Sequence, residues 1–188
     1  MKSIVLLPLL ALFATTVLAA PEAYLIDGTH TLPRFSYNHF GYSTQLSRFD
    51  KTIGKIVLDR QAKAGSVDVS VDMTSINTGS ALFNEHIQGA DFLDTAHYPT
   101  MTFQSNTLKF DGDHLTGVDG MLTLKGISKP VTLTVTSFQC MPHPMLKKEA
   151  CGANATTVVK RTDFNMGKYA PNVGDDVTVT IPVEAIKE

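Results

Sequence analysis

Histidines are the side chains of this sequence best suited to hold a metal or to move a proton, and their spacing favours neither role. No two of them stand four residues apart, as in the helical zinc motif. His30 and His39 are nine residues apart on a predicted strand, which places them on opposite faces if the strand is regular. We therefore predict no metal site. The six positions are His30, His39, His86, His97, His114 and His143.

The sequence motifs of common catalytic sites are missing from the chain. It contains no Gly-x-Ser-x-Gly elbow, no phosphate-binding loop and no dinucleotide fingerprint. The carboxylates are scattered, and Asp91 and Asp94, which flank Phe92 and Leu93, are interpreted as hydrogen-bonding groups near a helix end. We therefore predict that the protein is not an enzyme and has no catalytic residue.

Cys140 and Cys151 are the two cysteines, with ten residues between them. In an exported chain such a pair predicts a disulfide, which would stabilise the fold by about 3 kcal/mol at most. The alternative is a redox or metal-binding pair, but the spacing matches neither Cys-x-x-Cys nor a usual zinc site. Residues 141–150 contain two prolines and are predicted to form a loop rather than a regular strand ladder.

The first 19 residues have the pattern of a signal peptide. Lys2 precedes an uncharged apolar run over residues 4–18, and the small residues Val17 and Ala19 predict cleavage after Ala19. The run is shorter than the ~20 residues that a membrane-spanning helix needs. Residues 20–188 are about the size of one domain, and the net charge of −2 offers no basic surface for nucleic acid. We therefore expect a single exported, periplasmic domain without a membrane span.

Alternation of apolar and polar residues dominates the rest of the chain and predicts strands. The clearest runs are 67–73, 131–135 and 177–183, and less regular candidates are 24–40, 52–59, 101–110, 115–125 and 156–161. Residues 80–93 alone have helical spacing, and we expect one or two turns of helix there. About eight strands joined by short turns favour a closed barrel or a sandwich.

The interior of such a barrel is the feature on which function depends. An eight-stranded barrel can be filled by its own side chains or can hold one small ligand, and the alternation alone leaves both open. The inward positions are mostly valine, isoleucine, leucine, phenylalanine and methionine. Such a lining suits a hydrocarbon better than a sugar or a nucleotide.

Several short motifs are spread in order over residues 26–177. They are Ile26-Asp27-x-x-His30, Asn38-His39, Gly54-x-Ile56-x-x-Asp59, Ser75-Ile76-Asn77-Thr78, Glu85-His86-Ile87, Asp91-Phe92-Leu93-Asp94, Tyr98-Pro99, Leu122-Thr123-Leu124-Lys125-Gly126, Arg161-Thr162-Asp163-Phe164-Asn165-Met166 and Val173-Gly174-Asp175-Asp176-Val177. A chain with these motifs in this order resembles the YceI-like family, the bacterial polyisoprenoid-binding proteins.

This resemblance implies an all-β fold: an eight-stranded antiparallel, lipocalin-like barrel with one short helix and an elongated apolar cavity. It implies a ligand such as a polyprenol or a prenyl quinone and no cofactor of another kind. We predict that His39 or Arg161 meets a polar head group or satisfies buried backbone groups, with an ion pair to Asp163 or another acid as the alternative for Arg161. The predicted ligand-binding residues are Phe35, Tyr37, His39, Phe49, Phe103, Leu122, Arg161, Phe164 and Met166.

The tail of such a lipid would dominate its affinity. Each buried CH₂ contributes about 0.8 kcal/mol, whereas one neutral hydrogen bond contributes about 1 kcal/mol net. The expected function is therefore a periplasmic binding or carrier protein for a long isoprenoid, whose head group the sequence does not specify. The alternatives are a quinone-linked redox or stress-response accessory protein without its own catalytic site, and a barrel filled by its own side chains. The expected partners beyond the lipid are a second copy, as a homodimer, and a membrane cytochrome, beside which family members sometimes occur.

Overall fold

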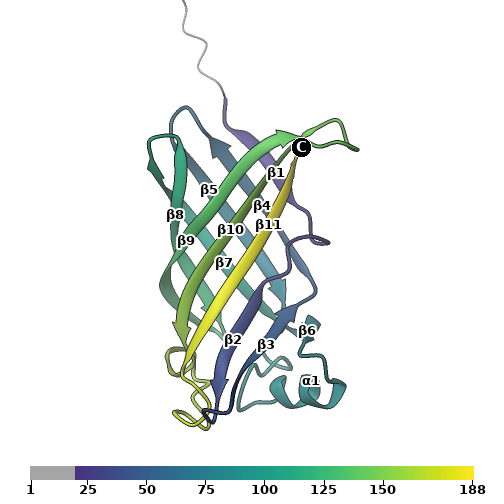
Figure 1. Ribbon diagram of the computed structural model, residues 1–188, viewed down its shortest axis with the longest axis vertical. Helices are drawn as coiled ribbons and strands as arrows, with labels where there is room; N and C mark the ends of the chain where they lie inside the picture. Colours follow the sequence, from purple (N-terminus) through teal and green to yellow (C-terminus); the bar gives the residue numbers. More distant parts are fainter. Residues whose placement is uncertain (1–19) are drawn as a thin grey trace, which may run out of the picture.

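Eight antiparallel strands close into a barrel, which confirms the predicted fold class (Figure 1). The computed structural model describes residues 20–188, so the predicted signal peptide lies outside the described residues. Alternating side chains point into the barrel, which is why these strands have a period of two. Around the barrel the order is β1 (Glu22–Ile26), β4 (Thr52–Asp59), β5 (Ala64–Asp72), β7 (Thr100–Asp111), β8 (His114–Leu124), β9 (Ile127–Pro142), β10 (Glu149–Lys160) and β11 (Asp176–Lys187), and β11 pairs with β1 to complete the ring.

Three further strands extend the sheet at one end of the barrel. They are β2 (Arg34–His39), β3 (Ser43–Phe49) and β6 (Ile76–Asn77), with β2 paired to β11. Residues 24–40 are thus two strands and not the single strand predicted. Gly28 and Pro33 lie in the bend between them, where turn-forming residues interrupt the ladder.

The bend lets β11 change its partner along its length. Residues 178–180 pair with β2 and residues 185–187 pair with β1, and Pro182, which has no N–H to donate, falls in the gap. The buried side chain of Thr31 bridges this gap. Its Oγ1 donates to the carbonyl oxygen of Glu184 at 3.1 Å and accepts from the N–H of the same residue at 3.0 Å.

The hairpin of β9 and β10 carries the disulfide, and Cys140 lies directly opposite Cys151. The disulfide prediction is confirmed, but the predicted loop is too long. Both strands continue past the cysteines, and only residues 143–148 connect them. Pro142 pairs with Glu149 as the last residue of β9, a strand end that tolerates proline.

One short helix, α1 (Ala81–Ile87), lies at the opposite end of the barrel from this hairpin (Figure 1). Ser80 caps it by accepting a hydrogen bond from the N–H of Phe83. This confirms the one or two turns of helix expected within residues 80–93; Gly89 follows the helix, and tight turns form the rest of that stretch. Two 3₁₀ turns, η1 (Met73–Ser75) and η2 (Arg161–Phe164), lie near the same end.

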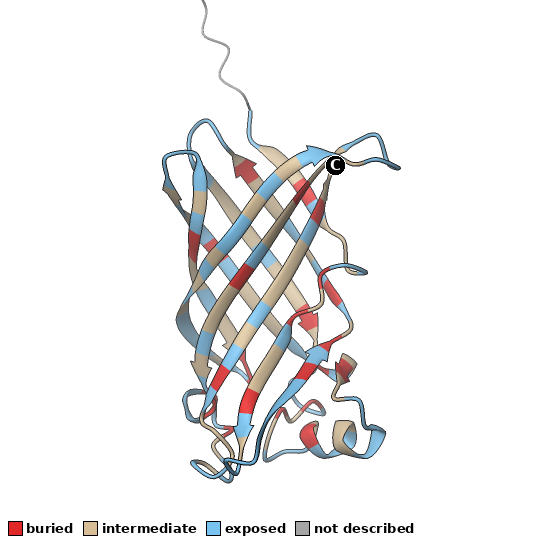
Figure 2. Ribbon diagram, in the orientation of Figure 1, coloured by how far each residue is buried: buried red, intermediate tan, exposed pale blue. Residues whose placement is uncertain are grey.

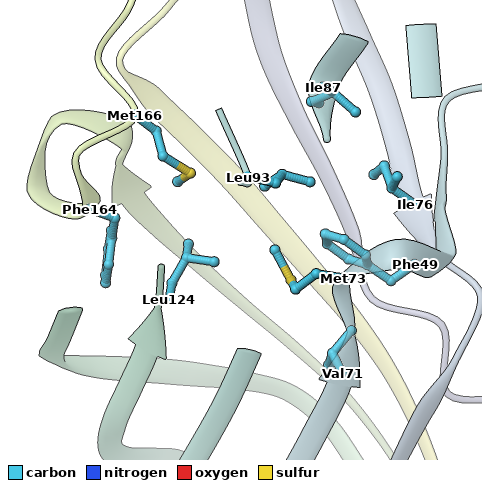
Figure 3. Close-up of a cluster of buried hydrophobic side chains, with 9 residues drawn as sticks. All are labelled: Phe49, Val71, Met73, Ile76, Ile87, Leu93, Leu124, Phe164 and Met166. Atoms are coloured by element: carbon cyan, nitrogen blue, oxygen red, sulfur yellow. The ribbon is translucent and has the colours of Figure 1, made fainter. Parts of the chain in front are cut away.

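Buried hydrophobic side chains form two clusters, one near each end of the barrel. Most of the barrel wall is partly buried or exposed (Figure 2). The larger cluster joins α1 and the turns after it to β3, β5 and β8 (Figure 3). Its members are Phe49, Val71, Met73, Ile76, Ile87, Leu93, Leu124, Phe164 and Met166. The smaller cluster, Tyr24, Leu58, Cys151 and Ala185, lies at the disulfide end.

Candidate ligand-binding cavity

A cavity of about 420 Å³ runs inside the barrel, within the usual size range of small-molecule sites. Its wall is almost entirely apolar, because the inward positions of successive strands carry valine, leucine and isoleucine. These side chains are partly exposed because they face the open cavity. On β9 and β11 they are Val131, Leu133, Val135, Val179, Ile181 and Val183.

Phe103 is a wall residue whose place depends on a glycine of the neighbouring strand. A Cβ atom at Gly120 would lie 2.4 Å from Cζ of Phe103, a distance that no real side chain allows. Glycine at position 120 therefore lets the Phe103 ring lie flat against β8. Leu122, next on the same strand, lies opposite Phe103 and also lines the cavity.

The cavity is closed at the disulfide end by Tyr24, which is 1% exposed. Its hydroxyl lies 2.5 Å from Oε1 of Glu149 and 2.8 Å from Oε2 of Glu22. Arg60 and Lys187 neutralise these carboxylates. The hydrogen bond from Lys187, followed by that from Tyr24, lowers the pKa of Glu22 to about 2. Burial, followed by the bond to Glu149, raises the pKa of Tyr24.

The mouth lies at the other end, where cavity-lining residues become exposed. Phe40 in the β2–β3 turn, His86 on α1 and Tyr169 in the segment 165–175 all line the cavity and reach solvent. Three neighbouring aromatic rings lie side by side across this end of the barrel. The ring centres of His86 and Phe92 are 5.0 Å apart, and those of Phe92 and Tyr169 are 6.2 Å apart. The entrance is therefore framed by apolar and aromatic side chains.

Arg161 shapes the mouth by holding the segment 165–175. Its guanidinium donates to four backbone carbonyl oxygens, those of Met166 and Val173 at 2.6 Å, Gly174 at 2.8 Å and Lys168 at 3.1 Å. Of the predicted roles, satisfying buried backbone groups is therefore the one that the structure shows. Burial lowers the pKa of Arg161, which the nearby carboxylate of Asp175 opposes.

Eight of the nine predicted residues line the cavity: Phe35, Tyr37, His39, Phe49, Phe103, Leu122, Arg161 and Met166. Their contact with a ligand stays a prediction. Phe164 does not line the cavity, which corrects its predicted place in the wall. It is 1% exposed and packs in the larger core cluster, because the 3₁₀ turn before Asn165, whose φ is 54°, directs it there.

Several residues of the cavity escaped the sequence prediction. Tyr24 is the middle residue of β1 and the first residue of the stretch 24–40 that was predicted as a strand, but nothing local shows that it closes the barrel. Phe92 and His86 belong to recognised motifs without an evident role. Tyr169 and Phe40 lie in turns, where no periodicity marks a side chain as inward.

One group of metal-type side chains lies on the outer surface. Single ligand atoms of Asp27, His30 and Glu184 lie within 4.8 Å of one another. Asp27 already accepts hydrogen bonds from the N–H and hydroxyl of Thr29, and it lies 2.8 Å from Nδ1 of His30. The bonds from Thr29 and His30 lower the pKa of Asp27 to about 2. Asp27 and His30 are therefore held together by a local turn, and Glu184 of β11 lies beside that turn, with its Oε2 3.9 Å from Nδ1 of His30.

A closed antiparallel barrel around one apolar cavity defines the lipocalin-like class. Within that class, a family model described as the YceI-like domain matches residues 24–185, and the chain belongs to this family. It is 35% identical over 183 residues to Protein YceI of Escherichia coli O157:H7, covering 94% of this chain and 95% of that protein.

Two solved structures have the same fold as this chain. Burkholderia cenocepacia BcnA has a TM-score of 0.72 at 24% identity, covering 85% of this chain and 98% of that one. A polyisoprenoid binding domain from Saccharophagus degradans has a TM-score of 0.68 at 19% identity, covering 89% and 99%. At these identities the likeness shows the fold alone. Across residues 20–188, no helix has the length and hydropathy required to cross a membrane.

Proposed function

We propose that this protein binds one long apolar lipid of the isoprenoid class, a polyprenol or a prenyl quinone, and carries it in the periplasm. The observation that carries the proposal is the cavity itself, which is enclosed by apolar walls and open at one end. Protein interiors are normally close-packed, so a lumen of about 420 Å³ without side chains is not explained by the stability of the barrel.

The chemistry of the wall supports a hydrocarbon tail. Methylene groups gain about 0.8 kcal/mol each on leaving water, and a wall without charged groups in its middle imposes no desolvation cost. The related barrel from Saccharophagus degradans is described as a polyisoprenoid binding domain, which supports the same ligand class.

The disulfide between Cys140 and Cys151 supports the periplasmic location, because such bonds persist in oxidising compartments. We propose a binding role without a catalytic site. A homodimer and a membrane cytochrome partner stay predictions.

The test is to purify the protein from a bacterial periplasm, extract it with organic solvent and identify the extract by mass spectrometry. We expect about one isoprenoid molecule per protein molecule. Phe103→Ala should lower the amount of lipid retained, with only a small change in the free energy of unfolding. Protein that carries no lipid and takes up no added prenol would contradict the proposal. A bound quinone that is reduced and reoxidised on the protein would favour the redox alternative.

A further inference from the structure

Two tyrosines, Tyr24 and Tyr37, line the same cavity, but their hydroxyl groups differ in their hydrogen bonds. The hydroxyl of Tyr24 is engaged by two carboxylates at the closed end. The hydroxyl of Tyr37 forms no hydrogen bond with any residue between 20 and 188, although Tyr37 is only 7% exposed. Its oxygen is not sealed inside the protein, as the unpaired Oγ1 of Thr52 is, but stays open to the cavity, so the presence of this hydroxyl in an apolar lining requires an explanation.

Packing does not supply that explanation. Tyr37 shares the inward face of β2 with Phe35 and His39, which also line the cavity. Its ring stacks with that of Phe35, with centres 6.4 Å apart. Phenylalanine at position 37 would make the same ring contacts, so the packing of the ring does not require a hydroxyl group. The hydroxyl is therefore the part of the side chain that the folded protein itself does not use.

The position of Tyr37 is just inside the mouth. Two residues further along β2, His39 forms a bridge to Val173 in the segment that frames the entrance. Arg161 is close enough to act on Tyr37 electrostatically, but its guanidinium is directed at backbone carbonyls. Burial raises the pKa of Tyr37 against the opposing effect of Arg161, so the hydroxyl keeps its proton and can donate.

We propose that the Tyr37 hydroxyl donates a hydrogen bond to the oxygen of a lipid head group at the mouth, while the tail lies toward the closed end. This inference rests on the proposed function and names the ligand feature that the cavity selects. The ligand is a neutral isoprenoid with an acceptor oxygen at one end, such as a prenol hydroxyl or a quinone carbonyl. An isoprenoid hydrocarbon lacks that oxygen and should gain nothing from Tyr37.

Tyr37→Phe tests this directly, because it removes one oxygen and leaves the ring. Binding of geranylgeraniol and of squalene is measured by displacement of a fluorescent apolar probe from delipidated wild type and variant. We expect about fivefold weaker binding of geranylgeraniol, the equivalent of one neutral hydrogen bond, and unchanged binding of squalene. The thermal stability of the lipid-free variant should be equal to or above that of wild type.

Tyr42→Phe is the matched control, because Tyr42 is 88% exposed in the β2–β3 turn and does not line the cavity. It should leave the stability and the ratio of the two affinities at the wild-type values. A Tyr37→Phe protein with an unchanged ratio, or with equal losses for both lipids, overturns the assignment while leaving the proposed function intact. Failure of wild type to bind either lipid overturns the proposed function, and this inference with it.

Discussion

Two buried threonines in the wall of the cavity show how much a single hydroxyl group depends on its partners. Thr31 is 2% exposed, and its hydroxyl holds both backbone groups of Glu184 where β11 changes partner. Thr52 is 3% exposed, and its hydroxyl has no hydrogen-bond partner in the described part of the chain. The same side chain should therefore contribute to stability with opposite sign at the two positions.

We predict that Thr31→Val lowers the free energy of unfolding by about 2 kcal/mol, because it leaves a backbone N–H and a carbonyl without partners. Thr52→Val has the same shape change and should be neutral or stabilising by up to about 1 kcal/mol. Urea denaturation of the lipid-free proteins measures both. Equal destabilisation by the two substitutions would contradict this account of the hydroxyl groups.

Glu22 is the residue whose ionisation should make stability depend on pH. Its pKa falls from an ordinary 4.5 to about 2 through Lys187 and Tyr24. A carboxyl group with a lowered folded-state pKa stabilises the fold above its unfolded pKa, and the contribution is lost as the pH falls through the folded value. The loss should therefore occur between about pH 5 and pH 2.

We expect Glu22→Gln to cost about 1–2 kcal/mol at pH 7, a value reduced for the solvent screening of a partly exposed group. It should also flatten the decline in stability toward pH 2, measured by urea denaturation at several pH values. Glu85→Gln, on the exposed face of α1, is the control and should leave the wild-type pH profile. An unchanged profile for Glu22→Gln would be the contrary result.

At the scale of elements, the disulfide of the β9–β10 hairpin joins two strands that are already paired by backbone hydrogen bonds. Cys140 and Cys151 lie opposite each other in the ladder, close to the packed closed end. The bond restricts the unfolded chain over a short loop, so its effect should be moderate.

The double substitution Cys140→Ala with Cys151→Ala should lower the free energy of unfolding by about 2–3 kcal/mol. Wild type is the comparison: with its disulfide reduced, its free energy of unfolding should equal that of the double variant. Lipid occupancy, measured by mass spectrometry, should be retained, since the mouth lies at the opposite end. Loss of the lipid would indicate that the closed end depends on the disulfide for its shape.

At the scale of the whole molecule, the length of the lumen should set the length of the lipid. Ala153 faces the cavity between Phe138 and Val183, near the closed end. A larger side chain there would shorten the space available to a tail whose head lies at the mouth.

We predict that Ala153→Phe shifts binding toward shorter prenols in a competition between chain lengths, read by mass spectrometry of the bound fraction. Overpacking should cost about 1–3 kcal/mol of stability at most, since the side chain enters open space. Val158→Phe, on the outward face of the same strand, should keep the wild-type preference. An identical chain-length distribution for Ala153→Phe would mean that the tail does not reach the closed end.

The sequence by itself determined the all-β class, the approximate strands, the disulfide and the family. These are properties of local alternation and of motif order, which are readable without knowing what lies across the barrel. Strand alternation also indicated five of the residues that line the cavity, Phe35, Tyr37, His39, Phe103 and Leu122, whereas Phe49, Arg161 and Met166 were predicted from the family motifs.

Only the tertiary structure decided that the lumen is open and which of its polar groups have partners. Tyr24 meets a carboxylate 125 residues away, and Arg161 meets carbonyls of a segment without periodicity. Whether opposite walls touch or leave a cavity depends on the closure of eight strands together, and no single strand carries that information. The unpaired hydroxyl of Tyr37 likewise becomes visible only when every neighbour is in place.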